Sequence, residues 1–157
     1  MKIVLLMIGK TNQESLQKLI QDYQNRIQHY VNYETVVIPE LKNTKNLSRK
    51  EQKEKEAELI LKHIDNQDDI VLLDEKGKQF SSIAFSDFIA KKLISSSKRM
   101  IFVIGGPFGF SDRIYDKANG MISMSSMTFS HQMIRLIFVE QLYRAMTIIK
   151  GESYHHE

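Results

Sequence analysis

Residues 100–109 read MIFVIGGPFG, an apolar run that passes directly into a loop rich in glycine. The first five residues have the unbroken apolar character of a strand covered on both faces, which is typical of parallel sheets. Ligands of open α/β sheets bind at the carboxyl ends of strands, and glycine lets the backbone approach them closely. We therefore predict a ligand site at Gly105 and Gly106, with a tight strand-to-helix turn as the alternative.

The spacing of these glycines excludes two common phosphate-binding motifs. The dinucleotide fingerprint G-x-G-x-x-G is missing, and Pro107 interrupts the turn. A P-loop needs Gly-Lys-Ser/Thr, and none follows here. The loop therefore belongs to neither class.

Strand-like segments alternate with helical patterns along the whole chain, which predicts an α/β fold with a parallel-rich sheet and helices on both faces. The expected strands are Lys2–Ile8, Tyr33–Ile38, Ile70–Leu73, Met100–Ile104 and Met121–Met124. The expected helices follow capping boxes at Thr11-x-x-Glu14 and Ser48-x-x-Glu51, cover Ile83–Ser95 and Asp112–Ala118, and end with Gln132–Ile149. Residues 1–157 show no repeat or linker, so we expect a single domain.

The composition excludes several classes of chemistry and location. The 157 residues contain no cysteine, which excludes disulfides, thiolate metal sites and cysteine nucleophiles. The apolar run at residues 2–8 has no signal-peptide cleavage pattern, and it is far shorter than the roughly 20 residues that cross a bilayer. We expect a cytoplasmic protein that binds no metal and no membrane.

The charge is less decisive about partners. The chain has 22 Lys and Arg against 19 Asp and Glu, a formal net charge of +3. This value permits an RNA partner without requiring one. Lys42, Lys45, Arg49 and Lys50 precede or open a highly charged helix, either as a solvated face or as contacts to phosphates.

A second candidate ligand loop, residues 123–130, reads SMSSMTFS. Its hydroxyls, backbone donors and apolar side chains suit a ligand with an adenine ring and a ribose. The alternative interpretation is a set of helix caps, because serine and threonine are common before helices.

The last helix and the tail behind it supply the remaining candidates. The helix is apolar around its whole circumference, which predicts burial partly against another subunit. Glu140 and Arg144 form either an ordinary i,i+4 ion pair or a polar site at that interface. The tail reads YHHE, and its histidines either fray or fold back onto the site; they lack the spaced partners of a metal site.

Taken together, these segments resemble the RlmH (YbeA) family of SPOUT methyltransferases. The matching residues are Leu72-Leu73-Asp74 with Gly77-Lys78, Ile104-Gly105-Gly106-Pro107-x-Gly109, Ser123-x-Ser125-x-Met127-Thr128 with His131, Arg135 with Glu140-Gln141-Leu142-Tyr143-Arg144-Ala145, and Tyr154-His155-x-Glu157. Their order and spacing agree over essentially the whole chain. Ser130 departs from the family, whose members often carry proline there, and Phe108 and Phe129 are less common choices.

The resemblance implies a homodimer with a C-terminal trefoil knot. It implies an enzyme that uses S-adenosylmethionine to methylate N3 of pseudouridine 1915 in 23S ribosomal RNA. The cofactor site implied by the match comprises Leu73, Gly105, Gly106, Ser125, Ser126, Met127, Thr128, Phe129 and Ser130. Because the net charge is small, we expect an assembled ribosomal particle, rather than free RNA, to be the productive substrate.

Methylation at N3 requires the imide to lose a proton, so a base or a group that stabilises the anion should lie nearby. His155 is the first candidate for the base. Arg135 or Arg144 would stabilise charge on a uracil oxygen or hold a phosphate, with Glu140 beside Arg144. Two other functions stay open: methylation of another RNA such as tRNA, and a non-catalytic ribosome-binding module.

Overall fold

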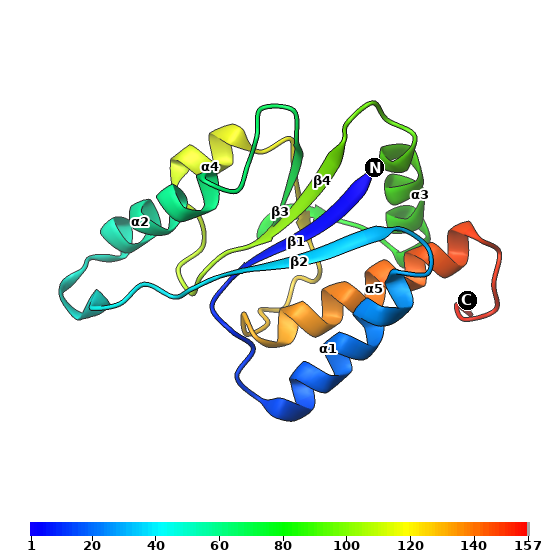
Figure 1. Cartoon of the computed structure of the whole chain (residues 1–157), viewed down its shortest axis with the longest axis horizontal. Coiled ribbons are helices and arrows are strands. Elements are labelled where there is room, and N and C mark those ends of the chain that lie inside the picture. Colours follow the sequence, from blue (N-terminus) through cyan, green and yellow to red (C-terminus); the bar gives the residue numbers. More distant parts are fainter. Residues whose placement is uncertain (157) are drawn as a thin grey trace.

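The computed structural model describes residues 1–156 and shows a five-stranded sheet with helices on both faces (Figure 1). The strands are β1 (Lys2–Ile8), β2 (Asn32–Ile38), β3 (Asp69–Gln79), β4 (Arg99–Ile104) and β5 (Gly120–Ser123). The helices are α1 (Glu14–Ile27), η1 (Thr44–Asn46, a 3-10 turn), α2 (Arg49–Leu61), α3 (Ser82–Leu93), α4 (Asp112–Lys117) and α5 (Met133–Ile149). Every strand pair is parallel, in the order β2-β1-β4-β3-β5, which confirms the predicted fold class. Glu157, the last residue of the tail motif, lies outside the described residues.

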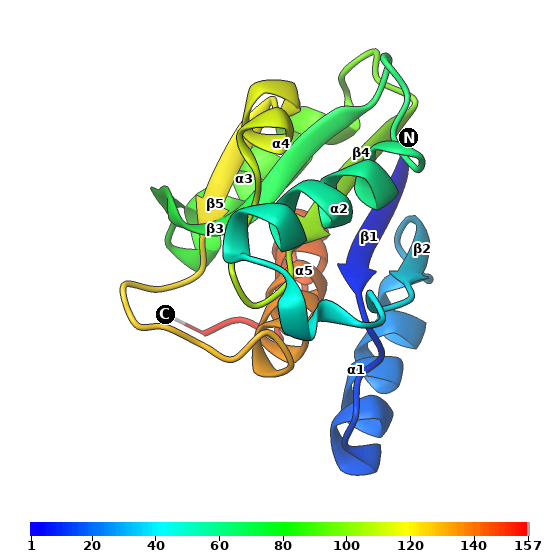
Figure 2. The same ribbon diagram turned by 90° about the vertical axis from the view of Figure 1, so that its left-hand side faces the viewer.

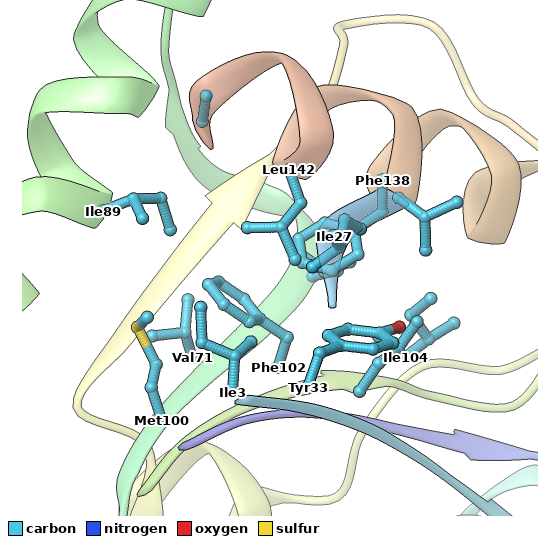
Figure 3. Close-up of a cluster of buried hydrophobic side chains, with 14 of the residues drawn as sticks. Ile3, Ile27, Tyr33, Val71, Ile89, Met100, Phe102, Ile104, Phe138 and Leu142 are labelled. Carbon is cyan, nitrogen blue, oxygen red and sulfur yellow. The ribbon is translucent and has the colours of Figure 1, made fainter. Parts of the chain in front are cut away.

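The two faces of the sheet bury two separate apolar cores. Alternate side chains of a strand point to opposite faces of the sheet. Ile3 and Leu5 of β1 therefore lie in one core, and Val4 between them lies in the other. The first core lies under α1, α3 and α5, and Figure 3 shows Phe138 and Leu142 of α5 above Phe102 of β4. The second core lies under α2 and α4, which Figure 2 shows in front of the sheet, with α5 behind it. Covering both faces explains why the central strands are apolar without interruption.

Helix α5 lies on the same face as α1 and α3 (Figure 1). Its buried residues include Phe138, Val139, Leu142, Ala145 and Met146, whereas Met133 and Ile149 at its two ends are exposed. Part of its apolar circumference is therefore buried within the chain itself. No helix within residues 1–156 has the length and apolar character needed to cross a membrane.

The two predicted capping boxes had different outcomes. The box at the start of α2 is confirmed, because Ser48 Oγ accepts from Glu51 N at 3.1 Å and Glu51 Oε1 accepts from Ser48 N at 3.4 Å. The box at Thr11 is wrong: α1 begins at Glu14, and no side chain caps it. Thr11 Oγ1 instead accepts from Arg135 Nη1 at 3.1 Å, so a distant partner replaces the local cap.

Strand β3 is longer than its apolar run. Ile122 of β5 aligns first with Leu73 and then with Lys78, so residues 74–77 bulge out of the ladder. Gly77 allows this, because a Cβ there would lie 2.6 Å from the backbone of Ile122. The bulge places charged residues beside the carboxyl end of β4.

Candidate active site

A cavity of about 720 Å³ lies at the carboxyl ends of β3, β4 and β5. Its walls are the bulge of β3, the glycine loop after β4 and the loop between β5 and α5. Eight of the nine expected cofactor-binding residues line it, namely Leu73, Gly105, Gly106, Ser125, Met127, Thr128, Phe129 and Ser130. The ninth, Ser126, is exposed, and its Oγ accepts from Gln79 Nε2 at 2.8 Å. The structure therefore gathers two sequence-distant loops around one space.

The glycine loop is packed tightly against neighbouring side chains. A Cβ on Gly105 would lie 3.0 Å from the Phe110 ring, and a Cβ on Gly106 would lie 2.4 Å from Glu56 Oε2. Gly109 has a φ of +81°, a conformation that other residues rarely adopt. The loop thus needs glycine for packing as well as for its turn, which agrees with the tight-turn interpretation; the ligand site at Gly105 and Gly106 stays a prediction.

The loop between β5 and α5 combines internal hydrogen bonds with open apolar surface. Ser125 Oγ accepts from Met127 N at 3.0 Å, and Ser130 Oγ accepts from Met133 N at 3.1 Å as α5 begins. Some of its hydroxyls therefore act as caps. Met127 is 76% exposed and Phe129 is 36% exposed, so their side chains are available to cover an apolar ligand.

The rim of the cavity carries charges of both signs. Tyr115 OH donates to Asp74 Oδ2 at 2.5 Å, and Lys76 N donates to Asp74 Oδ1 at 2.8 Å. Burial, and then the bond to Asp74, raise the pKa of Tyr115 well above its usual value. Arg49 stacks over Phe108, with its guanidinium carbon 5.0 Å from the ring centroid. Sequence reasoning missed Tyr115, because its place on a short helix carries no signal of a site.

A second polar cluster lies where the tail folds back onto α5. Arg144 Nη2 donates to Glu140 Oε1 at 2.5 Å, and Tyr154 OH donates to the same oxygen at 3.0 Å. Arg144 Nη1 lies 3.2 Å from His155 Nδ1. The hydrogen bond to Glu140 raises the pKa of Arg144. We call Glu140, Arg144, Tyr154 and His155 the tail cluster; residues 154 and 155 are packed rather than frayed.

The tail cluster lies at the middle and the C-terminal half of α5, whereas the cavity lies at the start of this helix. The cavity is lined by His131 and Ile134, at the start of this helix, and by none of the tail-cluster residues. Ile134 at the cavity and Arg144 in the tail cluster are ten residues apart, which corresponds to a rise of about 15 Å along the helix. One copy of the chain therefore does not bring these two groups of expected site residues together.

Arg135 is fully buried and faces β1. Its Nη2 donates to Ile8 O at 2.8 Å, its Nη1 to Gly9 O at 2.9 Å and its Nε to His131 O at 3.1 Å. Burial lowers the pKa of Arg135, and the charge of Glu40 opposes the shift. In this arrangement the guanidinium ties α5 to the end of β1 and has no free face for a nucleotide. Separately, residues 1–156 contain no cluster of three or more His, Cys, Asp or Glu that could hold a metal ion.

The all-parallel sheet, with helices on both faces and a cavity at the carboxyl ends of three strands, is an α/β architecture. A family model described as "Predicted SPOUT methyltransferase" matches residues 1–155. The chain is 57% identical to a protein named Ribosomal RNA large subunit methyltransferase H from Christiangramia forsetii, over 99% of each chain. It is also 57% identical to one of the same name from Parabacteroides distasonis, over all of both chains. The chain belongs to this family of ribosomal RNA large subunit methyltransferases.

The fold is shared with a solved structure of much lower sequence identity. That structure is described as "a probable methylase family protein from Haemophilus influenzae Rd KW20". It is 12% identical, with a TM-score of 0.51 over 95% of this chain and 66% of that chain. The likeness therefore concerns the arrangement of the sheet and helices alone.

Proposed function

We propose that this chain methylates N3 of pseudouridine 1915 in 23S ribosomal RNA, with S-adenosylmethionine as the methyl donor. The names of the full-length relatives support large-subunit ribosomal RNA as the substrate class. The observation that carries the proposal is the cavity in which the glycine loop meets the Ser/Thr/Met loop. The resemblance further implies a trefoil knot in the C-terminal half and activity in the cytoplasm, and both stay predictions.

The residues of the cavity fit the methyl donor. Leu73, Met127 and Phe129 offer apolar surface for an adenine ring, and the backbone of the glycine loop is open to the same space. S-adenosylmethionine supplies an already electrophilic methyl group and leaves as a neutral thioether. The protein therefore has chiefly to orient the reacting groups.

The positions of the tail cluster and the cavity support a homodimer as the working unit. A twofold axis that packs two α5 helices antiparallel brings the end of one beside the start of the other. Each cavity would then face the tail cluster of the other copy. Arg144 Nε and His155 Nε2 are buried, and neither has a hydrogen-bond partner within residues 1–156.

In such a dimer the catalytic roles divide between the two copies. His155 takes the N3 proton at Nδ1, the nitrogen that accepts from Arg144 Nη1 in the chain alone. Arg144, held by Glu140, is thereby released from His155 and stabilises charge on a uracil oxygen or holds a phosphate. Arg135 is a positioning residue that fixes the start of α5. Pairing also doubles the net charge available to attract RNA, although the total stays small beside that of a dedicated RNA-binding domain.

The test is methylation of ribosomes from a strain that lacks the gene. We expect the purified chain to transfer one methyl group to N3 of pseudouridine 1915 in these ribosomes, located by mass mapping of the RNA. A free stem-loop of the same sequence should be a poor substrate. Methylation of tRNA instead would favour a different SPOUT specificity, and absence of calorimetric heat with S-adenosylmethionine would favour a non-catalytic ribosome-binding module.

A further inference from the structure

A second, smaller cavity of about 150 Å³ lies behind the glycine loop. Gly106, Pro107 and His131 line both this cavity and the larger one, so the two adjoin at the glycine loop. The small cavity is also lined by Glu56 of α2 and by Glu40, which follows β2. Neither carboxylate belongs to the residues that the proposed function uses.

Glu56 is a buried carboxylate without a counter-ion. The residue is 4% exposed, and its Oε1 has no hydrogen-bond partner within residues 1–156. Burial raises the pKa of Glu56, the Gln52 side chain opposes the shift, and the charge of Glu40 adds to it. A buried polar atom of this kind costs stability unless a ligand satisfies it.

The carboxylate lies directly against the glycine loop. A Cβ on Gly106 would lie 2.4 Å from Glu56 Oε2, so Glu56 reaches the loop only because residue 106 has no side chain. The charge of Arg135 acts on Glu40, but its guanidinium donates to the carbonyl oxygens of Ile8 and Gly9 and forms no ion pair with either glutamate within residues 1–156. Two carboxylates thus face one arginine, which leaves a net negative charge. The small cavity is therefore anionic where it adjoins the larger one.

An anionic cavity selects among the ligands of the proposed reaction. Two carboxylates repel the phosphates of RNA and attract a cation. The methyl donor carries such a cation in the α-ammonium group of its amino-acid end. We infer that Glu56, assisted by Glu40, binds this ammonium group and so determines where the amino-acid end of the donor lies. The inference rests on the proposed function, because it requires the donor to occupy the larger cavity.

The test compares two ligands that differ in the amino-acid end. S-adenosylhomocysteine carries the ammonium group, whereas 5′-methylthioadenosine lacks the whole amino-acid end. A hydrogen bond to a charged group contributes about 1.5–3 kcal/mol, so Glu56→Gln should weaken S-adenosylhomocysteine binding about 10- to 100-fold in calorimetry. Binding of 5′-methylthioadenosine should change less than about twofold, because it makes no contact that the substitution removes.

Matched variants separate this contact from damage to the fold. Glu58→Gln lies on the exposed face of the same helix and should leave both affinities unchanged. Glu40→Gln should weaken S-adenosylhomocysteine binding in the same direction as Glu56→Gln, but less, because Glu40 is exposed to water. Glu56→Gln should keep a single cooperative unfolding transition, with a midpoint no lower than that of wild type.

The following outcomes would overturn the inference. Equal loss of both ligands in Glu56→Gln would mean that the glycine loop itself is disturbed, and unchanged binding of both would mean that no ammonium contact exists. If the wild-type chain binds neither ligand, the proposed function fails as well. If the wild type binds both and methylates ribosomes while Glu56→Gln behaves like it, only the ammonium contact fails.

Discussion

Two glutamates on helices that cover opposite faces of the sheet have opposite environments. Glu140 in the tail cluster accepts from Arg144, Tyr154 and Gln141, with Gln141 Nε2 2.9 Å from its Oε2. Glu56 behind the glycine loop is more deeply buried and leaves Oε1 without a partner. The carboxylate of the tail cluster thus has hydrogen-bond partners on both oxygens. The carboxylate of Glu56 behind the glycine loop has one oxygen without a partner within residues 1–156. Polar groups left unsatisfied in a folded chain point to a ligand.

The largest changes in activity should come from substitutions in the site that the cavity of one copy and the tail cluster of the other would form together. Arg144→Ala removes a charge-stabilising group and should lower ribosome methylation about 100-fold. Gly106→Ala places a Cβ 2.4 Å from Glu56 Oε2, and overpacking of this kind should weaken donor binding about 10- to 100-fold. Calorimetry with S-adenosylhomocysteine should show a loss for Gly106→Ala alone.

Mixing these two variants tests whether the ends meet across a dimer. Random exchange of subunits makes half of the dimers mixed, and each mixed dimer would hold one intact site, so activity should return to about a quarter of wild type. Gly120→Ala, where a Cβ meets no atom within 4 Å, is the control and should stay active. Failure of the mixture to regain activity would contradict a site shared between copies.

The next effect concerns the buried arginine at the cavity end of α5. Arg135→Met leaves the carbonyl oxygens of Ile8 and Gly9 buried without donors, so the free energy of unfolding should fall by about 3 kcal/mol. Urea denaturation measures this change. Arg113→Met, at an exposed arginine whose nearest acidic oxygen is 3.9 Å away, should change stability by less than about 0.5 kcal/mol. A similar small change in Arg135→Met would show that Arg135 is not a positioning residue.

The smallest expected changes are in the free energy of unfolding, and they test the contrast between Glu56 and Glu140. Glu56→Gln should stabilise the chain at neutral pH by about 1 kcal/mol, because it removes an uncompensated buried charge. Glu140→Gln should destabilise it by a similar ~1 kcal/mol, because Arg144 loses its partner. Thermal or urea unfolding at pH 7 measures both changes, and the same sign for the two variants would contradict the contrast.

The stabilisation expected from Glu56→Gln should depend on pH in a definite direction. The pKa of Glu56 is raised in the folded chain, so the wild type loses stability as the pH rises from the unfolded-state pKa through the folded one. The gain from Glu56→Gln should therefore be full above the folded-state pKa. It should shrink as the pH falls through that pKa, and vanish below the unfolded value of about 4.3. Unfolding measured over this range checks the prediction.

The sequence predicted the elements of the fold well where the signal was local. Strand β1 has the expected bounds, and the other strands and helices have the expected order, because buried parallel strands require continuous apolar runs. The sequence predictions were wrong where a residue contacts a partner far away in the chain. Thr11 accepts a hydrogen bond from Arg135 instead of capping α1. Strand β3 extends past its apolar run because β5 pairs with residues beyond the bulge. Local patterns carry no information about such partners.

By itself, the sequence determined the sheet, its two-sided burial and the loops that surround the cavity. Apolar periodicity and glycine placement depend on steric and hydrophobic effects that act over a few residues. Only the tertiary structure decided which polar groups meet. It buried Arg135 against β1, kept the tail cluster apart from the cavity along α5, and brought Glu56 against Gly106, 50 positions along the chain. Contacts of that kind depend on how the layers pack.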